Sequence, residues 1–114
     1  MTAPDPADTV LVLTTLPSPD EARALVRELV DQRLAACGTI LERVTSVYRW
    51  EGKVEVAAES QVMLKTRRGC WEGLQSAVQQ LHPYDVPELL AVPIETGLPA
   101  YLEWVRSETT DPQG

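Results

Sequence analysis

The 114-residue sequence contains no phenylalanine, one histidine and two cysteines. One imidazole and two thiols are too few for a four-ligand zinc or Cu(I) site within a single chain. The cysteines form no CxxC pair and no disulfide framework, which favours a reduced, cytoplasmic protein. Basic residues are also scarce, because 10 Lys and Arg stand against 17 Asp and Glu, giving a formal net charge of −7. A chain this acidic is not expected to bind nucleic acid or an anionic membrane.

Long apolar runs and catalytic motifs are missing as well. No apolar run approaches the ~20 residues that a membrane-spanning helix needs. The segment 1–8 lacks the basic and apolar regions of a signal peptide. No phosphate-binding glycine loop, HExxH or nucleophile elbow occurs, so no residue argues for an enzyme. The length fits one domain over residues 9–107, with flexible tails predicted at 1–8 and 108–114.

Hydrophobic periodicity predicts seven elements in this domain. Helical spacing covers residues 19 to about 33, 69–81 and 98–107, and Ser18, Pro19 and Glu21 form a capping box before the first helix. Short apolar runs at 10–13 and 89–94 predict strands. The order β-α-β-β-α-β-α predicts an α+β, ferredoxin-like fold, in which an antiparallel sheet carries two helices on one face and is followed by an additional C-terminal helix.

The segment between residues 40 and 66 changes to a period of two, which predicts a long β-hairpin. Glu51 and Gly52 are the turn signal between its arms. Both arms exceed the usual strand length of ~5–6 residues, so the hairpin should project beyond a domain of this size. Because a projecting ribbon with apolar residues needs a partner to cover it, this segment is the first indication of oligomerisation.

Several polar side chains have two open interpretations. His82 lies near a predicted helix end, where it is either a metal ligand or acid/base group, or a cap hydrogen-bonded to carbonyl groups. Cys37 is either a ligand for a soft metal or a small buried residue at a strand start. Three glutamates recur every four residues, Glu51, Glu55 and Glu59. They form either a weak divalent-cation site or a solvated face of the hairpin.

Aromatic residues near the hairpin tip also leave two alternatives. Tyr48 and Trp50 point to the same side of the predicted strand. They either stack on a flat ligand or anchor the hairpin on a neighbouring subunit, where Trp and Tyr are frequent hot spots.

Four motifs resemble those of the CutA divalent-cation tolerance family. They are SVYRWEGKVE (46–55), LKT (64–66), HPYDVPE (82–88) and YLEWV (101–105), and LAAC (34–37) after the first helix agrees with them. Together the matching segments span about residues 10–106. The resemblance implies a compact homotrimer whose sheets face inward and whose hairpins pair with neighbouring subunits. It also implies a cytoplasmic, non-enzymatic protein of the metal-ion response that requires no cofactor.

The same resemblance implies weak binding of copper or another divalent cation, with His82 and Cys37 as candidate ligands. Thr14 and Leu81 stand where some copper-binding members have a cysteine and a second histidine, so tight copper binding is not expected.

The implied architecture is also similar to that of the PII signalling proteins, which bind small effectors in clefts between subunits. An alternative function is therefore a trimeric sensor or scaffold with such a cleft. Candidate residues for its lining combine charge and aromatic surface, as ligand pockets do: Arg49, Trp50, Lys65, Tyr84 and Glu88.

Overall fold

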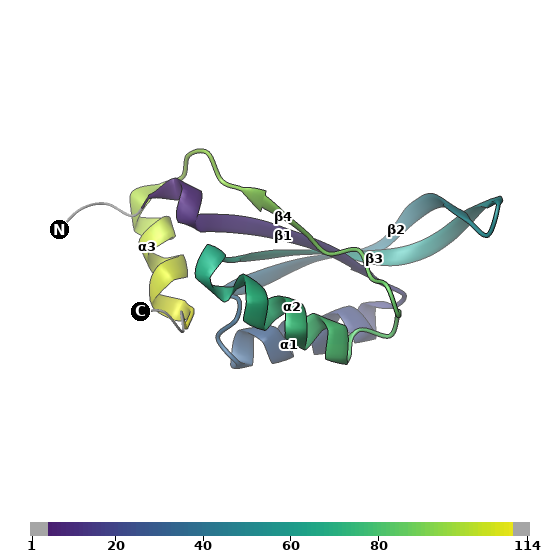
Figure 1. The fold of residues 1–114 in the computed structure, drawn as a ribbon, viewed down its shortest axis with the longest axis horizontal. Coiled ribbons are helices and arrows are strands. Elements are labelled where there is room, and N and C mark those ends of the chain that lie inside the picture. The colour runs from purple at the N-terminus through teal and green to yellow at the C-terminus, as the bar shows by residue number, and fades with distance from the viewer. Residues whose placement is uncertain (1–4, 111–114) are drawn as a thin grey trace.

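The computed structural model describes residues 5–110 and confirms the predicted order β-α-β-β-α-β-α, with two added 3-10 turns (Figure 1). The elements are η1 (Pro6–Asp8), β1 (Thr9–Leu16), α1 (Pro19–Asp31), β2 (Cys37–Trp50), β3 (Lys53–Arg67), η2 (Arg68–Cys70), α2 (Trp71–Leu81), β4 (Leu90–Pro93) and α3 (Pro99–Glu108). The outermost parts of both predicted tails, 1–4 and 111–114, lie outside the described residues. No helix among the described residues is long and apolar enough to cross a membrane.

The four strands form one antiparallel sheet in the order β2-β3-β1-β4. Helices α1 and α2 lie side by side against one face of this sheet, and α3 packs across β1 and β3 at one end (Figure 1). Alternate residues of β1 and β3 point toward α1 and α2, as the period of two predicts. Their apolar side chains form the core with residues of both helices: Val10, Val12, Leu16, Ala22, Leu25, Leu29, Val62, Leu64, Leu74, Ala77 and Val78.

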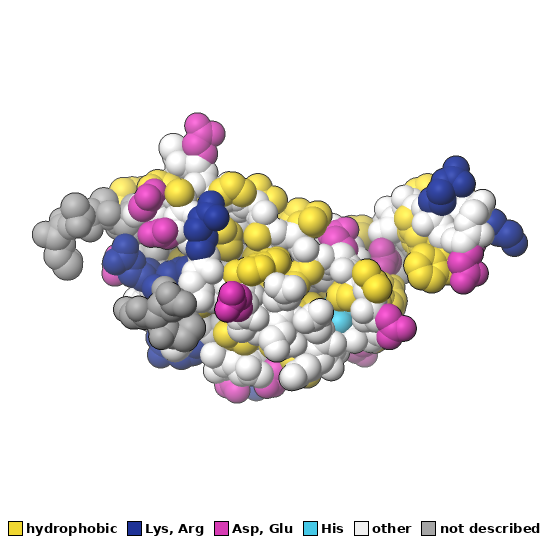
Figure 2. Space-filling model, viewed as in Figure 1, with side chains coloured by type: hydrophobic (Ala, Val, Ile, Leu, Met, Phe, Trp, Pro, Cys, Tyr) yellow, Lys and Arg dark blue, Asp and Glu magenta, His cyan; other side chains and the backbone are white. Residues whose placement is uncertain are grey.

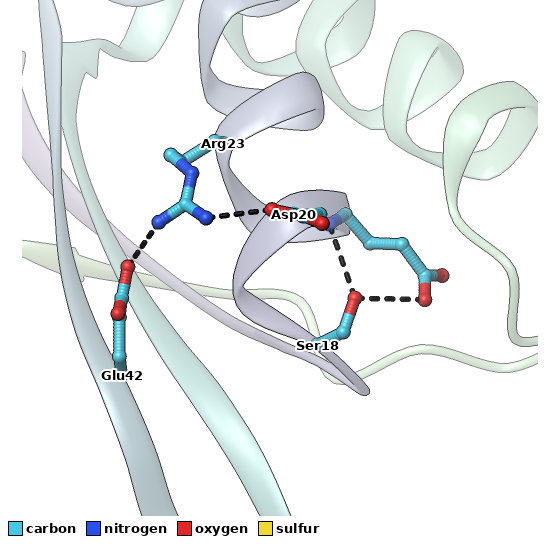
Figure 3. A network of polar contacts seen from close by, with 5 residues as sticks. Ser18, Asp20, Arg23 and Glu42 are labelled. Atoms are coloured by element: carbon cyan, nitrogen blue, oxygen red, sulfur yellow. Dashed lines mark hydrogen bonds and ion pairs between the residues drawn. The ribbon is translucent and has the colours of Figure 1, made fainter.

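Helix α1 begins with the predicted capping box (Figure 3). The Glu21 backbone N–H donates to Ser18 Oγ at 3.2 Å, and Ser18 Oγ donates to the Glu21 carboxylate at 3.0 Å. Two residues later Arg23 forms ion pairs with Asp20, at 2.6 Å, and with Glu42 of β2. Arg23 therefore ties the first helix to the neighbouring strand.

Glu42 lies in a β-bulge that the sequence pattern did not predict. The register of β2 against β3 shifts between Leu41 and Val44, and Arg43 takes a φ of 59°. A bulge adds a residue to one strand and increases its twist. The bulge therefore bends the outer part of the hairpin away from the body of the domain.

The hairpin ends in the two-residue turn predicted from the sequence. Glu51 and Gly52 have φ values of 49° and 80°, the pair of positive values that a type I′ turn requires. The arms project from the body, and the molecule measures 53 × 25 × 22 Å (Figure 1). Its radius of gyration is 14.9 Å, whereas a compact domain of this length is expected near 13 Å. The predicted overhang is confirmed.

The sheet face opposite α1 and α2 is largely uncovered and carries an apolar patch. Its residues alternate with the core residues along each strand, and the large apolar side chains half-exposed or exposed there are Leu11, Leu13, Leu41, Met63, Leu90 and Val92. Figure 2 shows hydrophobic side chains along the upper side of the molecule and on the projecting hairpin. Contiguous apolar surface of this kind marks an interaction site.

Several boundaries differ from the sequence-based prediction. Strand β1 runs to Leu16 because antiparallel pairing with β3 continues through the threonines that interrupt its apolar run. Residues 108–110, predicted as part of a tail, are packed. The Thr110 N–H donates to the Arg33 carbonyl at 2.9 Å, and Cys70 Sγ donates to the Thr110 carbonyl at 3.2 Å.

Candidate functional site

A groove of about 580 Å³ lies along the hairpin outward from the bulge, where the hairpin faces the end of β1 and the loop between α2 and β4. Its volume falls in the ~300–1,000 Å³ range of small-molecule sites. Strand β2 contributes two aromatic residues, Tyr48 and Trp50, which lie two positions apart and therefore share one face of the hairpin. The lining residues are Thr15, Ser46, Val47, Tyr48, Trp50, Glu59, Tyr84, Val86 and Glu88.

Glu59 and Tyr84 form the polar centre of the groove. Glu59 is 9% exposed, and its carboxylate accepts a hydrogen bond from the Tyr84 phenol at 2.9 Å. Burial, together with the hydrogen bond and charge of Glu59, raises the pKa of Tyr84 to about 12. The phenol therefore stays protonated at neutral pH and serves as a fixed donor to Glu59.

His82 holds the groove loop rather than facing a ligand. It caps α2, and its side chain is only 7% exposed. Nε2 lies 2.7 Å from the Thr15 carbonyl oxygen, and Nδ1 accepts the Tyr84 backbone N–H at 3.1 Å. These partners require the neutral tautomer with its proton on Nε2. A metal ligand needs a free imidazole lone pair, and neither ring nitrogen of His82 offers one.

Cys37 does not lie beside His82 within one chain. Cys37 opposes Lys65 on β3, whereas the Thr15 that contacts His82 is opposite Gln61. That offset of four residues is about 13 Å along the strand. Cys37 is half-buried, and its Sγ lies 3.5 Å from Tyr101 Oη.

The two predicted metal residues therefore do not fit a copper site within one chain. The described residues also contain no group of three or more His, Cys, Asp or Glu side chains placed to hold a metal ion. Thr14 is fully buried in the core, and Leu81 is half-exposed at the end of α2. Neither residue adds a ligand.

The candidate cleft residues separate into two groups. Trp50, Tyr84 and Glu88 line the groove. Arg49 opposes Val54 and, as the neighbour of Trp50 on the same strand, points to the other face of the hairpin. Lys65 lies six residues beyond Glu59 on β3 and donates to Thr39 Oγ1 at 2.9 Å. A single subunit therefore places neither basic residue in the groove.

Glu59 is the groove residue whose role the sequence did not reveal. Its spacing from Glu55 suggested a shared solvated face or a weak cation site, yet only Glu59 is buried. The pairing of Glu59 with Tyr84 crosses 25 residues of sequence. The feature of the sequence that could have indicated this role is the position of Glu59, a charged residue directly before the buried stretch of β3 and beside small residues.

Comparison with known proteins gives evidence on this chain that is independent of the geometry of the groove. The family model described as CutA1 divalent ion tolerance protein matches residues 10–108. The chain belongs to this family. A Thermus thermophilus relative named divalent-cation tolerance protein CutA is 43% identical over 99 residues, covering 87% of this chain and 96% of its own length.

Other members of the family agree in sequence and in fold. The crystal structure of CutA from Xylella fastidiosa superposes with a TM-score of 0.88 at 40% identity, covering 90% of this chain and 99% of that one. An Arabidopsis thaliana relative named Protein CutA, chloroplastic is 40% identical over 100 residues, covering 88% of this chain and 55% of its own length. This CutA1-family chain thus spans nearly all of the bacterial relative but little more than half of the plant one.

Proposed function

We propose that this chain acts in tolerance to divalent metal ions as a homotrimer of ferredoxin-like subunits, without catalytic activity. Membership of the CutA1 family supports the metal-ion role. The antiparallel sheet with α1 and α2 on one face supports the ferredoxin-like assignment. We also propose a cytoplasmic location, which the two free cysteines, Cys37 and Cys70, support.

The uncovered apolar sheet face is the observation that carries the oligomeric part of this proposal. Leu90 and Val92 of β4 lie exposed beside the half-buried Leu11 and Leu13 of β1. The projecting hairpin adds Val54 and other exposed apolar side chains. Burying such surfaces against other subunits contributes ~25 cal/mol per Å², whereas leaving them in water favours aggregation.

Sedimentation equilibrium tests this assembly. The wild-type protein is expected at three times the 12.6 kDa chain mass. The double variant Leu90→Lys/Val92→Lys places two charges on the apolar face and is expected to sediment as a monomer. Val30→Lys, on the exposed side of α1, is the matched control and should remain assembled. A wild-type mass of one chain at micromolar concentration would overturn the proposed homotrimer.

We propose that any bound divalent cation is held weakly. Support comes from the engagement of both His82 ring nitrogens and from the separation of His82 and Cys37. A copper titration against a competing chelator should give the same weak affinity for wild type and His82→Ala. Saturable binding that outcompetes the chelator and disappears in His82→Ala would overturn this view and make His82 the copper anchor.

The groove favours a second candidate function, the binding of a small effector. Its volume and its mixture of aromatic and acidic side chains are those of a ligand site. A ligand that binds the native state raises the melting temperature by mass action. A thermal-shift panel of small metabolites should therefore contain a stabilising compound whose effect is lost in Trp50→Leu. Stabilisation by no compound of the panel would count against an effector role.

A further inference from the structure

We propose that the helix-covered side of this protein docks a basic, amphipathic segment of a partner protein, with a bulky apolar side chain beside two Lys or Arg residues. The site is the helix groove, a second groove of about 320 Å³ between α1 and the C-terminal end of α2. Its lining residues are Glu21, Ala24, Leu25, Glu28, Leu81 and Pro83. This surface is separate from the metal and effector candidates above, and the proposal goes beyond both.

The apolar part of the helix groove arises where the buried stripe of α2 runs past the core. Leu74, Ala77 and Val78 form that stripe and are buried. Leu81 continues it one turn later but is 48% exposed, because no residue of the chain covers this last turn. Across the groove Ala24 of α1 is small and exposed, so it leaves room for a side chain. An apolar side chain of a partner would bury the exposed surface of Leu81.

The α1 wall of the helix groove is acidic. Glu21 and Glu28 are the charged residues of the lining. They lie seven positions apart on one side of the helix, which corresponds to about 10.5 Å. Glu21 accepts a hydrogen bond from Ser18, and Glu28 accepts one from Gln32 at 2.7 Å. Among the described residues no ion pair includes either carboxylate, so both remain available to a basic partner.

The basic residues of the two helices lie away from the helix groove. Arg23 pairs with Glu42 of β2, so it points to the strand side of α1. Arg27 follows one turn later and shares that side. Helix α2 contains no Lys or Arg. Figure 2 shows Asp and Glu side chains along the lower side of the molecule, where the two helices lie. Complementary charge therefore favours a basic partner and disfavours an acidic one.

The same charge excludes two other occupants. A second copy of this chain carries a net charge of −7 and would be repelled. The terminal segments 1–4 and 111–114 contain no Lys or Arg. In the proposed homotrimer the open sheet face and the hairpin are covered by other subunits, whereas α1 and α2 lie on the opposite face of the sheet. The helix groove therefore stays on the outer surface of the assembly, once in each subunit.

Fluorescence polarisation on the assembled wild-type protein tests this docking site. The probe is a fluorescein-labelled peptide of Lys, Leu and Ala whose leucines share one helical face and whose lysines recur seven positions apart, as the two glutamates do. We expect saturable binding of one peptide per subunit, and weaker binding as NaCl rises from about 50 to about 300 mM. The same peptide with every Lys replaced by Glu should not bind.

Charge-removing variants locate the acidic wall. Glu21→Gln/Glu28→Gln should weaken binding at least ~5-fold, since one exposed ion pair contributes up to about a factor of five. Glutamine still completes the capping box at Glu21 and still accepts from Gln32 at Glu28, so the helix should be retained. Glu72→Gln/Glu103→Gln removes the same charge from exposed positions outside the lining and should bind like wild type.

A second pair of variants locates the apolar part. Leu81→Ala should weaken binding by about 5-fold through lost apolar contact. Val30→Ala, which truncates an exposed apolar side chain of α1 outside the lining, is its matched control and should bind like wild type. All four variants should sediment with the wild-type mass, so that loss of docking is distinguished from loss of assembly.

Three results would overturn the proposal. Equal affinity of the wild type and the groove variants would place the peptide elsewhere on an acidic protein. Equal affinity for the Lys and Glu peptides would remove the argument from charge. The third is absence of saturable binding up to about 1 mM peptide.

Discussion

Replacing His82 by alanine tests whether this residue is a structural link in the loop. The ring joins two segments that lie 67 residues apart, through the Thr15 carbonyl, and it also accepts the Tyr84 N–H. In His82→Ala both partners lose their hydrogen bonds. The ring itself is 7% exposed, so its removal also leaves space in the packing between β1 and the loop.

The expected destabilisation follows from these contacts. Leaving the part-buried Thr15 carbonyl without the imidazole costs about 1–3 kcal/mol, and the loss of the second hydrogen bond adds about 1 kcal/mol. The truncated buried ring adds about 1 kcal/mol of lost apolar burial. We therefore expect His82→Ala to lower the free energy of unfolding by about 3–5 kcal/mol.

Urea denaturation followed by far-UV circular dichroism measures this change. Chain concentration is kept equal for all variants, because the stability of an assembled protein depends on it. His82→Gln retains a donor for the Thr15 carbonyl, and His82→Asn retains an acceptor for the Tyr84 N–H, so each should recover part of the loss. Leu81→Ala, at the exposed neighbouring position, controls for changes in helix α2. A loss below about 1 kcal/mol in His82→Ala would refute the structural role.

Three further predictions concern the hairpin, the tyrosines and a tight contact. Glu51→Asn should raise the free energy of unfolding by several tenths of a kcal/mol, because asparagine tolerates the positive φ of the type I′ turn. The midpoint of thermal unfolding should therefore rise, and a lower midpoint contradicts the turn assignment. Burial and Glu59 raise the pKa of Tyr84 to about 12, and the Cys37 hydrogen bond followed by burial raises that of Tyr101 to about 12. The folded state therefore holds protons that the unfolded state releases between pH 10 and 12. The stability that these two tyrosines contribute is complete below pH 10 and is lost as the pH rises toward 12. An ultraviolet titration that gives one shared pKa near 10 for all three tyrosines contradicts this prediction. Gly38→Ala should destabilise by about 1–3 kcal/mol in urea, because its Cβ would lie 2.7 Å from a valine methyl of α1; wild-type stability would show that the contact relaxes.

Local sequence signals located most of the fold. The capping residues Ser18 and Glu21 placed the start of α1, because a side-chain cap satisfies backbone donors only at a helix N-terminus. The turn at Glu51 and Gly52 and the long alternation around it predicted the projecting hairpin, since the side-chain period of a strand is fixed by its backbone. By contrast, the bulge at Arg43 has no glycine to mark it. It shows only in the pairing of β2 with β3, next to the ion pair between Arg23 and Glu42.

The sequence by itself thus determined the elements, their order and the likeness to CutA proteins, because these depend on neighbouring residues and contiguous motifs. Only the tertiary structure decided what the polar residues do. In the folded chain both ring nitrogens of His82 form hydrogen bonds, to the Thr15 carbonyl and the Tyr84 N–H, and Cys37 lies on another part of the sheet. Glu59 is buried and accepts a hydrogen bond from Tyr84. The physical reason is that hydrogen-bond partners, burial and the charge of a groove arise from segments distant in sequence, whose contacts exist only after the sheet and helices have packed.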